Sequence, residues 1–247
     1  MLEIDLTGTA DHAGVRLQLH ASGAAYLPKA ETLLVADAHF GKAVSFRRLG
    51  VPVPQGTTRQ TLRQIDDLVL QTGARQLVFL GDFLHSAEAH APSTQRALAD
   101  WRAWHPKLAL TLVRGNHDDR AGDPPASLHI DVVDEPYCLP VGSDTLALCH
   151  HPQRVDGCYA LAGHWHPCVS LRGAGRDRVR LACFWLGDPT THAVGVLPAF
   201  GSFTGMHPIE PRPGDRVFAV AGDLVRELPP RPSQTGRALM QASANPT

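Results

Sequence analysis

Five short segments of the chain carry aspartate, asparagine and histidine side chains, the residue types that bind divalent metals. Their sequences are Val35-Ala36-Asp37-Ala38-His39, Leu80-Gly81-Asp82, Arg114-Gly115-Asn116-His117-Asp118, Cys149-His150-His151-Pro152 and Ala162-Gly163-His164-Trp165-His166. Oxygen and imidazole ligands without thiolates suit a hard or borderline divalent ion better than a soft one. These side chains predict a two-metal hydrolytic site.

Each of these segments directly follows an apolar run that predicts a buried strand. The runs are Thr32–Ala36, Gln76–Leu80, Leu108–Val113, Thr145–Cys149 and the shorter Tyr159–Ala162. An α/β scaffold presents functional groups together at the ends of its strands. Asp37 and His39 are two residues apart, so an extended backbone places both on one side.

Helical patterns alternate with strands in the first half of the chain, which indicates an α/β layered fold. One predicted helix starts at Thr57 or Thr58, ends near Gly73 and packs through Leu62, Ile65 and Leu68 or Val69. A second starts near Pro92-Ser93 and buries Leu98, Trp101 and Trp104. Phe40–Gly56 is rich in Gly, Pro and basic residues, and we interpret it as a functional loop.

Strands dominate the second half of the chain. They are predicted at Ile130–Val133, Thr145–Cys149, Tyr159–Ala162, Val179–Leu186, Ala193–Leu197 and Val217–Val220, and an N-terminal hairpin at Val15–His20 and Ala24–Leu27. Two sheets packed face to face with helices outside is the arrangement that this order favours. We expect one domain over residues 1–228 and a mobile Pro-, Ser- and Ala-rich tail over 229–247.

Composition excludes several classes of protein. The 247 residues carry a formal net charge of −1, which argues against a strong general attraction to nucleic acid or to anionic membranes. No apolar run approaches the roughly 20 residues that span a bilayer. The acidic start Met1–Asp5 lacks the layout of a signal peptide, so a cytoplasmic location is expected. The five cysteines form no C-x-x-C pair and are expected to be thiols.

The motifs Asp-x-His, Gly-Asp, Gly-Asn-His-Asp, His-x-Pro and Gly-His-x-His occur in this order between Asp37 and His166. In that order they resemble the calcineurin-like metallophosphoesterase superfamily. Each motif alone is weak, but all five in order, each after an apolar run, are specific. The resemblance implies a four-layer αββα sandwich of two mixed β-sheets flanked by helices.

Further segments narrow the resemblance to one bacterial branch. They are Val-Ala-Asp-Ala-His-Phe-Gly-Lys at 35–42, Gly-Val-Pro-Val-Pro at 50–54, Gly-Asp-Phe-Leu-His-Ser at 81–86, Cys-Phe-Trp-Leu-Gly at 183–187 and Leu-Pro-Ala-Phe-Gly-Ser-Phe-Thr-Gly at 197–205. They look like the DNA-ligase-associated metallophosphoesterases, described as DNA-damage-response phosphodiesterases or endonucleases. The resemblance covers roughly residues 10 to 220 and implies Mn²⁺, with Fe, Zn or Co also compatible with the ligands. It also implies a DNA ligase and a helicase as partners.

The resemblance implies the following site. One metal is bound by Asp37, His39, Asp82 and His166, and the other by Asp82, Asn116, His150 and His164, with Asp82 bridging. His150 is preferred over its neighbour His151 because of the His-x-Pro spacing. A hydroxide shared by the metals attacks phosphorus. His117 protonates the leaving oxygen or holds a phosphoryl oxygen, and Asp118 fixes the His117 tautomer.

Basic residues near the ligands are candidate phosphate contacts, weighed against a solvated role. They are Lys42, Arg47, Arg48 and Arg114. Arg172, Arg176, Arg178 and Arg180 are predicted to lie on a hairpin, with a solvated face favoured over a nucleic-acid-contacting edge. His85, three residues after Asp82, is the other histidine most suspected of a functional role.

Three functions are compatible with these residues. The first is a dinuclear-metal phosphodiesterase acting on nucleic acid, as the resemblance implies. The second is a small-molecule phosphoesterase for nucleotides or cyclic nucleotides, which the near-neutral charge favours slightly. The third is a repair-complex scaffold with structural metals. The complete set of metal ligands and the presence of His117 argue against this third function.

Overall fold

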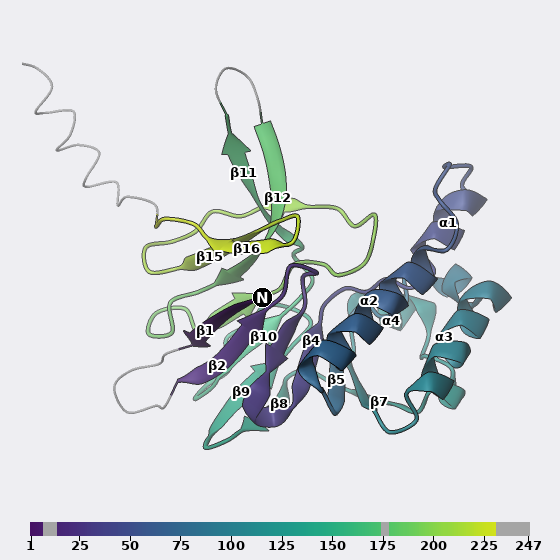
Figure 1. Ribbon diagram of the computed structural model, residues 1–247, viewed down its shortest axis with the longest axis horizontal. Helices are drawn as coiled ribbons and strands as arrows, with labels where there is room; N and C mark the ends of the chain where they lie inside the picture. Colours follow the sequence, from purple (N-terminus) through teal and green to yellow (C-terminus); the bar gives the residue numbers. More distant parts are fainter. Residues whose placement is uncertain (7–13, 174–177, 231–247) are drawn as a thin grey trace, which may run out of the picture.

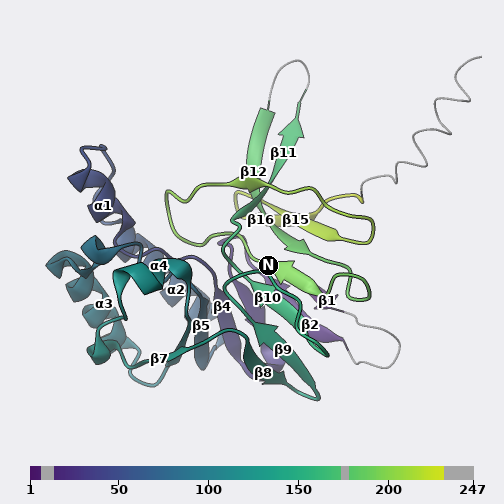
Figure 2. The ribbon, with the colours of Figure 1, turned by 180° about the vertical axis from the view of Figure 1, so that it is seen from behind.

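The computed structural model describes residues 1–6, 14–173 and 178–230. Two β-sheets pack face to face, and the α-helices lie on one side of the pair (Figures 1 and 2). The predicted tail lies outside the described residues apart from Pro229 and Pro230. Among the described residues, no helix is long and apolar enough to cross a membrane.

The first sheet has seven strands in sequential order. They are β1 (Leu2–Leu6), β2 (Val15–Leu19), β3 (Ala25–Leu27), β4 (Thr32–Val35), β5 (Gln76–Leu80), β6 (Ala109–Val113) and β7 (Ile130–Val133). Strands β1 to β4 pair antiparallel, which confirms the predicted N-terminal hairpin. Strands β4 to β7 pair parallel, so their carboxyl ends share one edge of the sheet.

Four α-helices lie beside this sheet: α1 (Lys42–Arg48), α2 (Thr57–Thr72), α3 (Pro92–Trp104) and α4 (Asn116–Ala121). The prediction for α2 is confirmed, since Leu62, Ile65 and Leu68 are buried. The predicted loop after Phe40 instead contains α1, because Gly and Pro lie only at the borders of a helix-compatible stretch. Trp104 is 84% exposed, so its predicted burial is wrong; it is the last residue of α3, beyond the buried Trp101.

The second sheet contains the remaining strands. They are β8 (Tyr137–Val141), β9 (Asp144–Leu148), β10 (Tyr159–Ala162), β11 (Pro167–Arg172), β12 (Arg178–Leu186), β13 (Val194–Val196), β14 (His207–Pro208), β15 (Arg216–Ala221) and β16 (Leu224–Glu227). Strands β9, β10 and β13 are parallel neighbours, whereas the other pairs are mostly antiparallel. The sheet is therefore mixed, as the first one is.

Apolar side chains fill both sides of the first sheet. Leu34 and Val78 face the second sheet and its Phe184 and Phe218, whereas other residues, such as Phe79, pack under the helices. The outer face of the second sheet carries a smaller apolar cluster that includes Trp185 and Val217. The predicted pair of mixed sheets with flanking helices is confirmed. The prediction gave four layers, αββα, whereas the described residues form three, αββ, because no described α-helix follows Ala121.

Candidate metal centre

The five motif segments meet at one edge of the two sheets. Asp37, Asp82 and Asn116 follow the neighbouring parallel strands β4, β5 and β6. His150 follows β9, and His164 lies just after its parallel neighbour β10. Because the carboxyl ends of parallel strands share an edge, the sheet topology explains why Asp37 and His164, which are 127 residues apart in sequence, converge.

The backbone at these positions is unusual. Eight described non-glycine residues have positive φ, and five of them are predicted ligands: Asp37, His39, Asp82, His164 and His166. The left-handed conformation costs a residue with a side chain about 1–2 kcal/mol. Such strain concentrates at functional sites, where the surrounding structure enforces it.

The glycines of the motifs leave room for the ligands. A Cβ atom on Gly163 would lie 2.6 Å from Asp37 Oδ2, and one on Gly115 would lie 2.5 Å from Asp82 Oδ1. A Cβ atom on Gly81 would overlap the His150 ring. The segments pack so closely that only glycine fits beside these ligands.

The first half of the centre contains Asp37, His39 and His166, whose ligand atoms lie within 4.8 Å of one another. His166 Nε2 lies 3.5 Å from Asp37 Oδ1, and His39 Nε2 lies 3.8 Å from Asp82 Oδ2. The Gly205 carbonyl accepts a hydrogen bond from His166 Nδ1 at 3.2 Å, which leaves Nε2 with its lone pair toward the site.

The second half contains Asp82, Asn116, His150 and His164. His150 Nε2 lies 2.9 Å from Asn116 Oδ1, 3.4 Å from Asp82 Oδ1 and 3.1 Å from His164 Nδ1. The two oxygens of Asp82 therefore face different halves, Oδ2 toward His39 and Oδ1 toward His150. This is the orientation that a bridging carboxylate requires.

His150 and His151 have different surroundings. His150 is fully buried, and its Nδ1 donates to the Leu80 carbonyl at 3.1 Å. His151 has a 46% exposed side chain, and its Nδ1 lies 2.7 Å from Glu135 Oε1. The geometry thus favours His150 as the ligand, with the Glu135 carboxylate also accepting both backbone N–H groups.

The donor set fits divalent cations. Asp37 and Asp82 are 0% and 2% exposed. Among the described residues, Asp37 Oδ1, His39 Nδ1 and His166 Nε2 are buried without a hydrogen-bond partner. Since His150 Nδ1 donates to Leu80, its Nε2 lone pair faces the oxygens of Asp82 and Asn116. Buried acceptor atoms that converge with too few donors are costly unless positive charge lies between them.

Burial also keeps the histidines neutral, as metal binding requires. Burial lowers the pKa of His39 far below its ordinary value, and the nearby Lys42 charge lowers it further. Burial likewise lowers the pKa of His164, with a smaller contribution from His150. Unprotonated imidazoles at neutral pH offer their lone pairs to a cation.

Comparison with solved structures identifies a close relative. The crystal structure of Pseudomonas putida nuclease MPE matches 92% of this chain and 99% of that chain, with 42% sequence identity and a TM-score of 0.76. This chain belongs to the metallophosphoesterase family. The E. coli phosphoesterase Yfce matches 78% of this chain and 90% of that one, with 15% identity and a TM-score of 0.38. No protein-family profile and no curated protein matches this metallophosphoesterase.

His117 of the metallophosphoesterase lies beside the bridging position. Its backbone N–H donates to Asp82 Oδ1 at 2.9 Å, and its Nε2 lies 3.9 Å from Asp82 Oδ2. Its Nδ1 donates to the His85 carbonyl at 2.7 Å. That hydrogen bond fixes the ring, so Nε2 is the atom that faces the site.

The prediction that Asp118 fixes the His117 tautomer is wrong. The buried Asp118 carboxylate accepts hydrogen bonds from the backbone N–H groups of Leu84 and Gly115, both at 3.0 Å. Burial raises the pKa of Asp118 to about 6. Asp118 therefore holds the backbone at Leu84 against the backbone at Gly115. The His85 backbone carbonyl, not Asp118, orients His117.

His85 lies at the site, as its spacing from Asp82 predicts. Its ring stacks on His117 with centroids 5.1 Å apart, and the two form a triad with His39 whose nitrogens lie within 4.8 Å. Burial and the Lys42 charge lower the pKa of His85 to about 4. A neutral His85 thus supports the ring of His117.

The four candidate phosphate contacts separate into two groups. Lys42 lies near the metal ligands: burial lowers its pKa, while the charges of Asp37 and Asp82 raise it. Arg47 donates to the Pro54 carbonyl, and Arg48 lies 3.9 Å from Glu88. Arg114 forms an ion pair with Asp123 at 2.7 Å. Of these four, Lys42 is the residue on which the charges of the predicted ligands Asp37 and Asp82 act.

We expect metal removal to destabilise this metallophosphoesterase. In EDTA no cation offsets the repulsion between the buried Asp37 and Asp82 carboxylates. Metal at 100 times its Kd adds about 2.7 kcal/mol of stability, which corresponds to a Tm about 5–10 °C higher in a chain of this size. Differential scanning fluorimetry with EDTA and with Mn²⁺ measures the shift. Equal Tm values under both conditions would contradict a metal centre here.

Proposed function

We propose that this protein is a divalent-metal-dependent phosphodiesterase that hydrolyses nucleic acid. The carrying observation is the Asp82 carboxylate, whose two buried oxygens face two separate groups of ligands. That arrangement suits a pair of cations about 3.5–4 Å apart, the spacing of two-metal hydrolysis. The 42% identity to a protein named as a nuclease supports the reaction class.

The residues around the centre have complementary roles in this reaction. Bound cations would lower the pKa of a water molecule and neutralise phosphate charge. Asn116 contributes a neutral oxygen, so the ligand set leaves net positive charge for an anionic substrate. Lys42 adds a cation on the side of His39. A protonated His117 carries a proton on Nε2, which it gives to the leaving oxygen.

The β11/β12 hairpin supports a polyanionic substrate. In its antiparallel register Arg172 lies opposite Arg178, and Arg180 lies opposite Ser170, so the three guanidinium groups share one face. All three residues are exposed, and none forms an ion pair with a described carboxylate. Like charges directly opposite each other are destabilising. A bound phosphate backbone relieves this repulsion.

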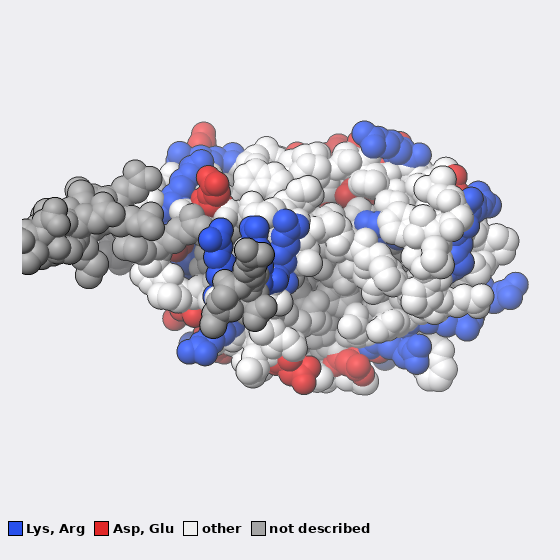
Figure 3. All heavy atoms as spheres, turned by 90° about the horizontal axis from the view of Figure 1, so that it is seen from above, with Lys and Arg blue, Asp and Glu red and all other residues white. Residues whose placement is uncertain are grey.

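The arginine face leads toward the metal centre. Ala182 lies on the same face, two residues after Arg180, and lines a cavity of about 180 Å³ with His166 and Phe203. Seen from above the hairpin, lysine and arginine side chains gather around it and also over the helices (Figure 3). Arg176 lies outside the described residues.

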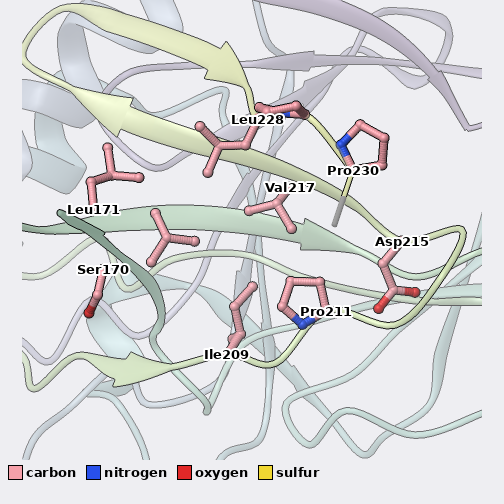
Figure 4. Close-up of a pocket in the computed structure, with 10 residues that line it drawn as sticks. Ser170, Leu171, Ile209, Pro211, Asp215, Val217, Leu228 and Pro230 are labelled. Carbon is pink, nitrogen blue, oxygen red and sulfur yellow. The ribbon is translucent and has the colours of Figure 1, made fainter. Parts of the chain in front are cut away.

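The opposite face of the hairpin is apolar. Leu171, Val217 and Leu228 surround a cavity of about 160 Å³ between β11, β15 and β16, as Figure 4 shows. None of the predicted metal ligands lines this cavity. The hairpin thus packs through one face and presents its arginines on the other.

The family resemblance further supports Mn²⁺ as the native metal and DNA repair as the process, in the cytoplasm and beside a DNA ligase and a helicase. Metal analysis of protein purified without added metal tests the first of these. An oxygen and nitrogen ligand set also accepts Fe, Zn or Co. Recovery of those metals in place of manganese would refute the Mn²⁺ proposal.

The test of the reaction class is hydrolysis of bis-p-nitrophenyl phosphate against p-nitrophenyl phosphate with Mn²⁺. We expect diester turnover that stops on addition of EDTA. A preference for the monoester would instead support the small-molecule phosphoesterase. Turnover of neither ester by the metal-loaded protein would support the scaffold.

We expect Arg178→Ala to weaken binding of a DNA oligonucleotide and to reduce the slope of log K against log salt by about 1, since each phosphate contact contributes about 0.7–0.9. Hydrolysis of bis-p-nitrophenyl phosphate should not change. Arg96→Ala, at an exposed position on α3, is the matched control. An unchanged salt slope in Arg178→Ala would remove the arginine face from the substrate-binding surface.

A further inference from the structure

An exposed tryptophan lies between two predicted metal ligands. Trp165 separates His164 from His166 and is 41% exposed. Both histidines have left-handed backbone, with φ values of 68° and 46°. The Trp165 backbone N–H donates to the Gly163 carbonyl at 2.8 Å. The local backbone therefore fixes the position of the indole relative to the metal centre.

A second tryptophan supports this indole. The rings of Trp165 and Trp185 stack with centroids 5.4 Å apart and an interplanar angle of 16°. Trp185 is 5% exposed, and its Nε1 donates to the buried Asp215 carboxylate at 2.8 Å. His192 lies against Trp185 with centroids 5.7 Å apart. Trp165 is thus the exposed end of an aromatic stack whose inner members are held in place.

The stack borders a hollow that includes a metal ligand. A pocket of about 570 Å³ is lined by His164, Trp165, Trp185, His207 and Arg212, among others. Its volume lies within the roughly 300–1,000 Å³ of small-ligand sites. Its wall offers flat aromatic surface, the Arg212 guanidinium and the Glu210 carboxylate. A flat aromatic group with polar edges suits these walls.

We propose that Trp165 is a nucleobase-stacking residue, which binds the base of a nucleotide next to the scissile phosphate in the pocket beside His164. Every base has a π-face that stacks on indole, so the contact tolerates any sequence. Trp185 and Asp215 position Trp165 for this contact. The proposal rests on the proposed phosphodiesterase function and names the part of the substrate that this pocket binds.

The test compares two substrates that differ only in their bases: an oligonucleotide of thymidines and a chain of equal length built from abasic tetrahydrofuran residues. Trp165→Phe keeps an aromatic ring at this position. Trp165→Leu keeps an apolar side chain over Trp185 but removes the aromatic ring. Trp104→Leu, at the 84% exposed end of α3, is the matched control. Thermal melting of each variant verifies that it is folded.

We expect Trp165→Leu to lower kcat/KM on the thymidine substrate about tenfold, mainly through KM, and to leave the abasic substrate unchanged. Trp165→Phe should retain most of the preference, and the control all of it. Equal losses on both substrates, or no loss on either, would overturn the proposal. Loss of the preference in Trp165→Phe as well would show packing rather than stacking.

Binding without turnover separates this proposal from the proposed function. Fluorescence anisotropy of labelled oligonucleotides measures the same preference in the metal-loaded His117→Ala variant, in which cleavage is slow. If this variant binds thymidines more tightly than the abasic chain and its combination with Trp165→Leu does not, the stacking residue is supported even if hydrolysis fails. If hydrolysis occurs and the two chains bind equally, the stacking residue is refuted and the phosphodiesterase remains.

Discussion

Asp82→Asn is expected to lower metal-dependent hydrolysis of bis-p-nitrophenyl phosphate by a factor on the order of 10³ or more. The change removes one negative charge from a 2% exposed position whose two oxygens face His39 and His150. An amide also presents an N–H group where a cation requires an oxygen. Steady-state kinetics with Mn²⁺ measures the loss.

Metal content and a surface variant complete this test. Equilibrium dialysis should show fewer than two metals per chain in Asp82→Asn, and its Tm should no longer respond to Mn²⁺. Asp119→Asn, with a 64% exposed side chain on α4, should behave as the wild type. Full activity in Asp82→Asn would disprove the bridging assignment, whatever the metal content.

His117→Ala should separate two substrates by the basicity of their leaving groups. Cleavage of DNA expels a basic alkoxide, so loss of the general acid should lower kcat about 10²–10⁴-fold. p-Nitrophenolate is a good leaving group that needs no proton, so hydrolysis of bis-p-nitrophenyl phosphate should fall less than about tenfold. The ratio of the two losses measures proton donation by His117.

The geometry behind this expectation is the ring orientation of His117. Its Nδ1 donates to the His85 carbonyl, so the transferable proton is on Nε2, on the side of Asp82. Equal losses on the two substrates would mean that His117 holds a phosphoryl oxygen instead of donating a proton. Metal binding by the variant, measured by dialysis, verifies that the centre remains intact.

Local sequence determined most of the framework. The apolar runs before Asp37, Asp82 and Asn116 are strands because such runs can be buried on both faces of a parallel sheet. The helix from Thr57 was equally predictable, since its apolar positions recur at helical spacing. The motif order also identified the family, because side chains that share one centre must occur at the ends of specific strands.

The average composition of a long segment did not predict some elements. The seven residues of α1 lie in a segment whose glycines and prolines predicted a loop, although these residues only border the helix. The outer face of the second sheet carries an apolar cluster but no helix among the described residues. Short elements and layer counts depend on contacts that a window average does not contain.

Only the tertiary structure decided the roles of neighbouring residues. Different hydrogen-bond partners distinguish His150 from His151. The Leu80 carbonyl, 70 residues away, accepts from His150 Nδ1, whereas His151 Nδ1 pairs with Glu135. Asp118 is occupied by backbone donors near residue 84, and His85 orients His117 through its carbonyl. Trp165 stacks on Trp185 of β12, which lies 20 residues later in the chain. Hydrogen bonds and stacking join segments that are distant in sequence, so residue type and spacing alone cannot assign these partners.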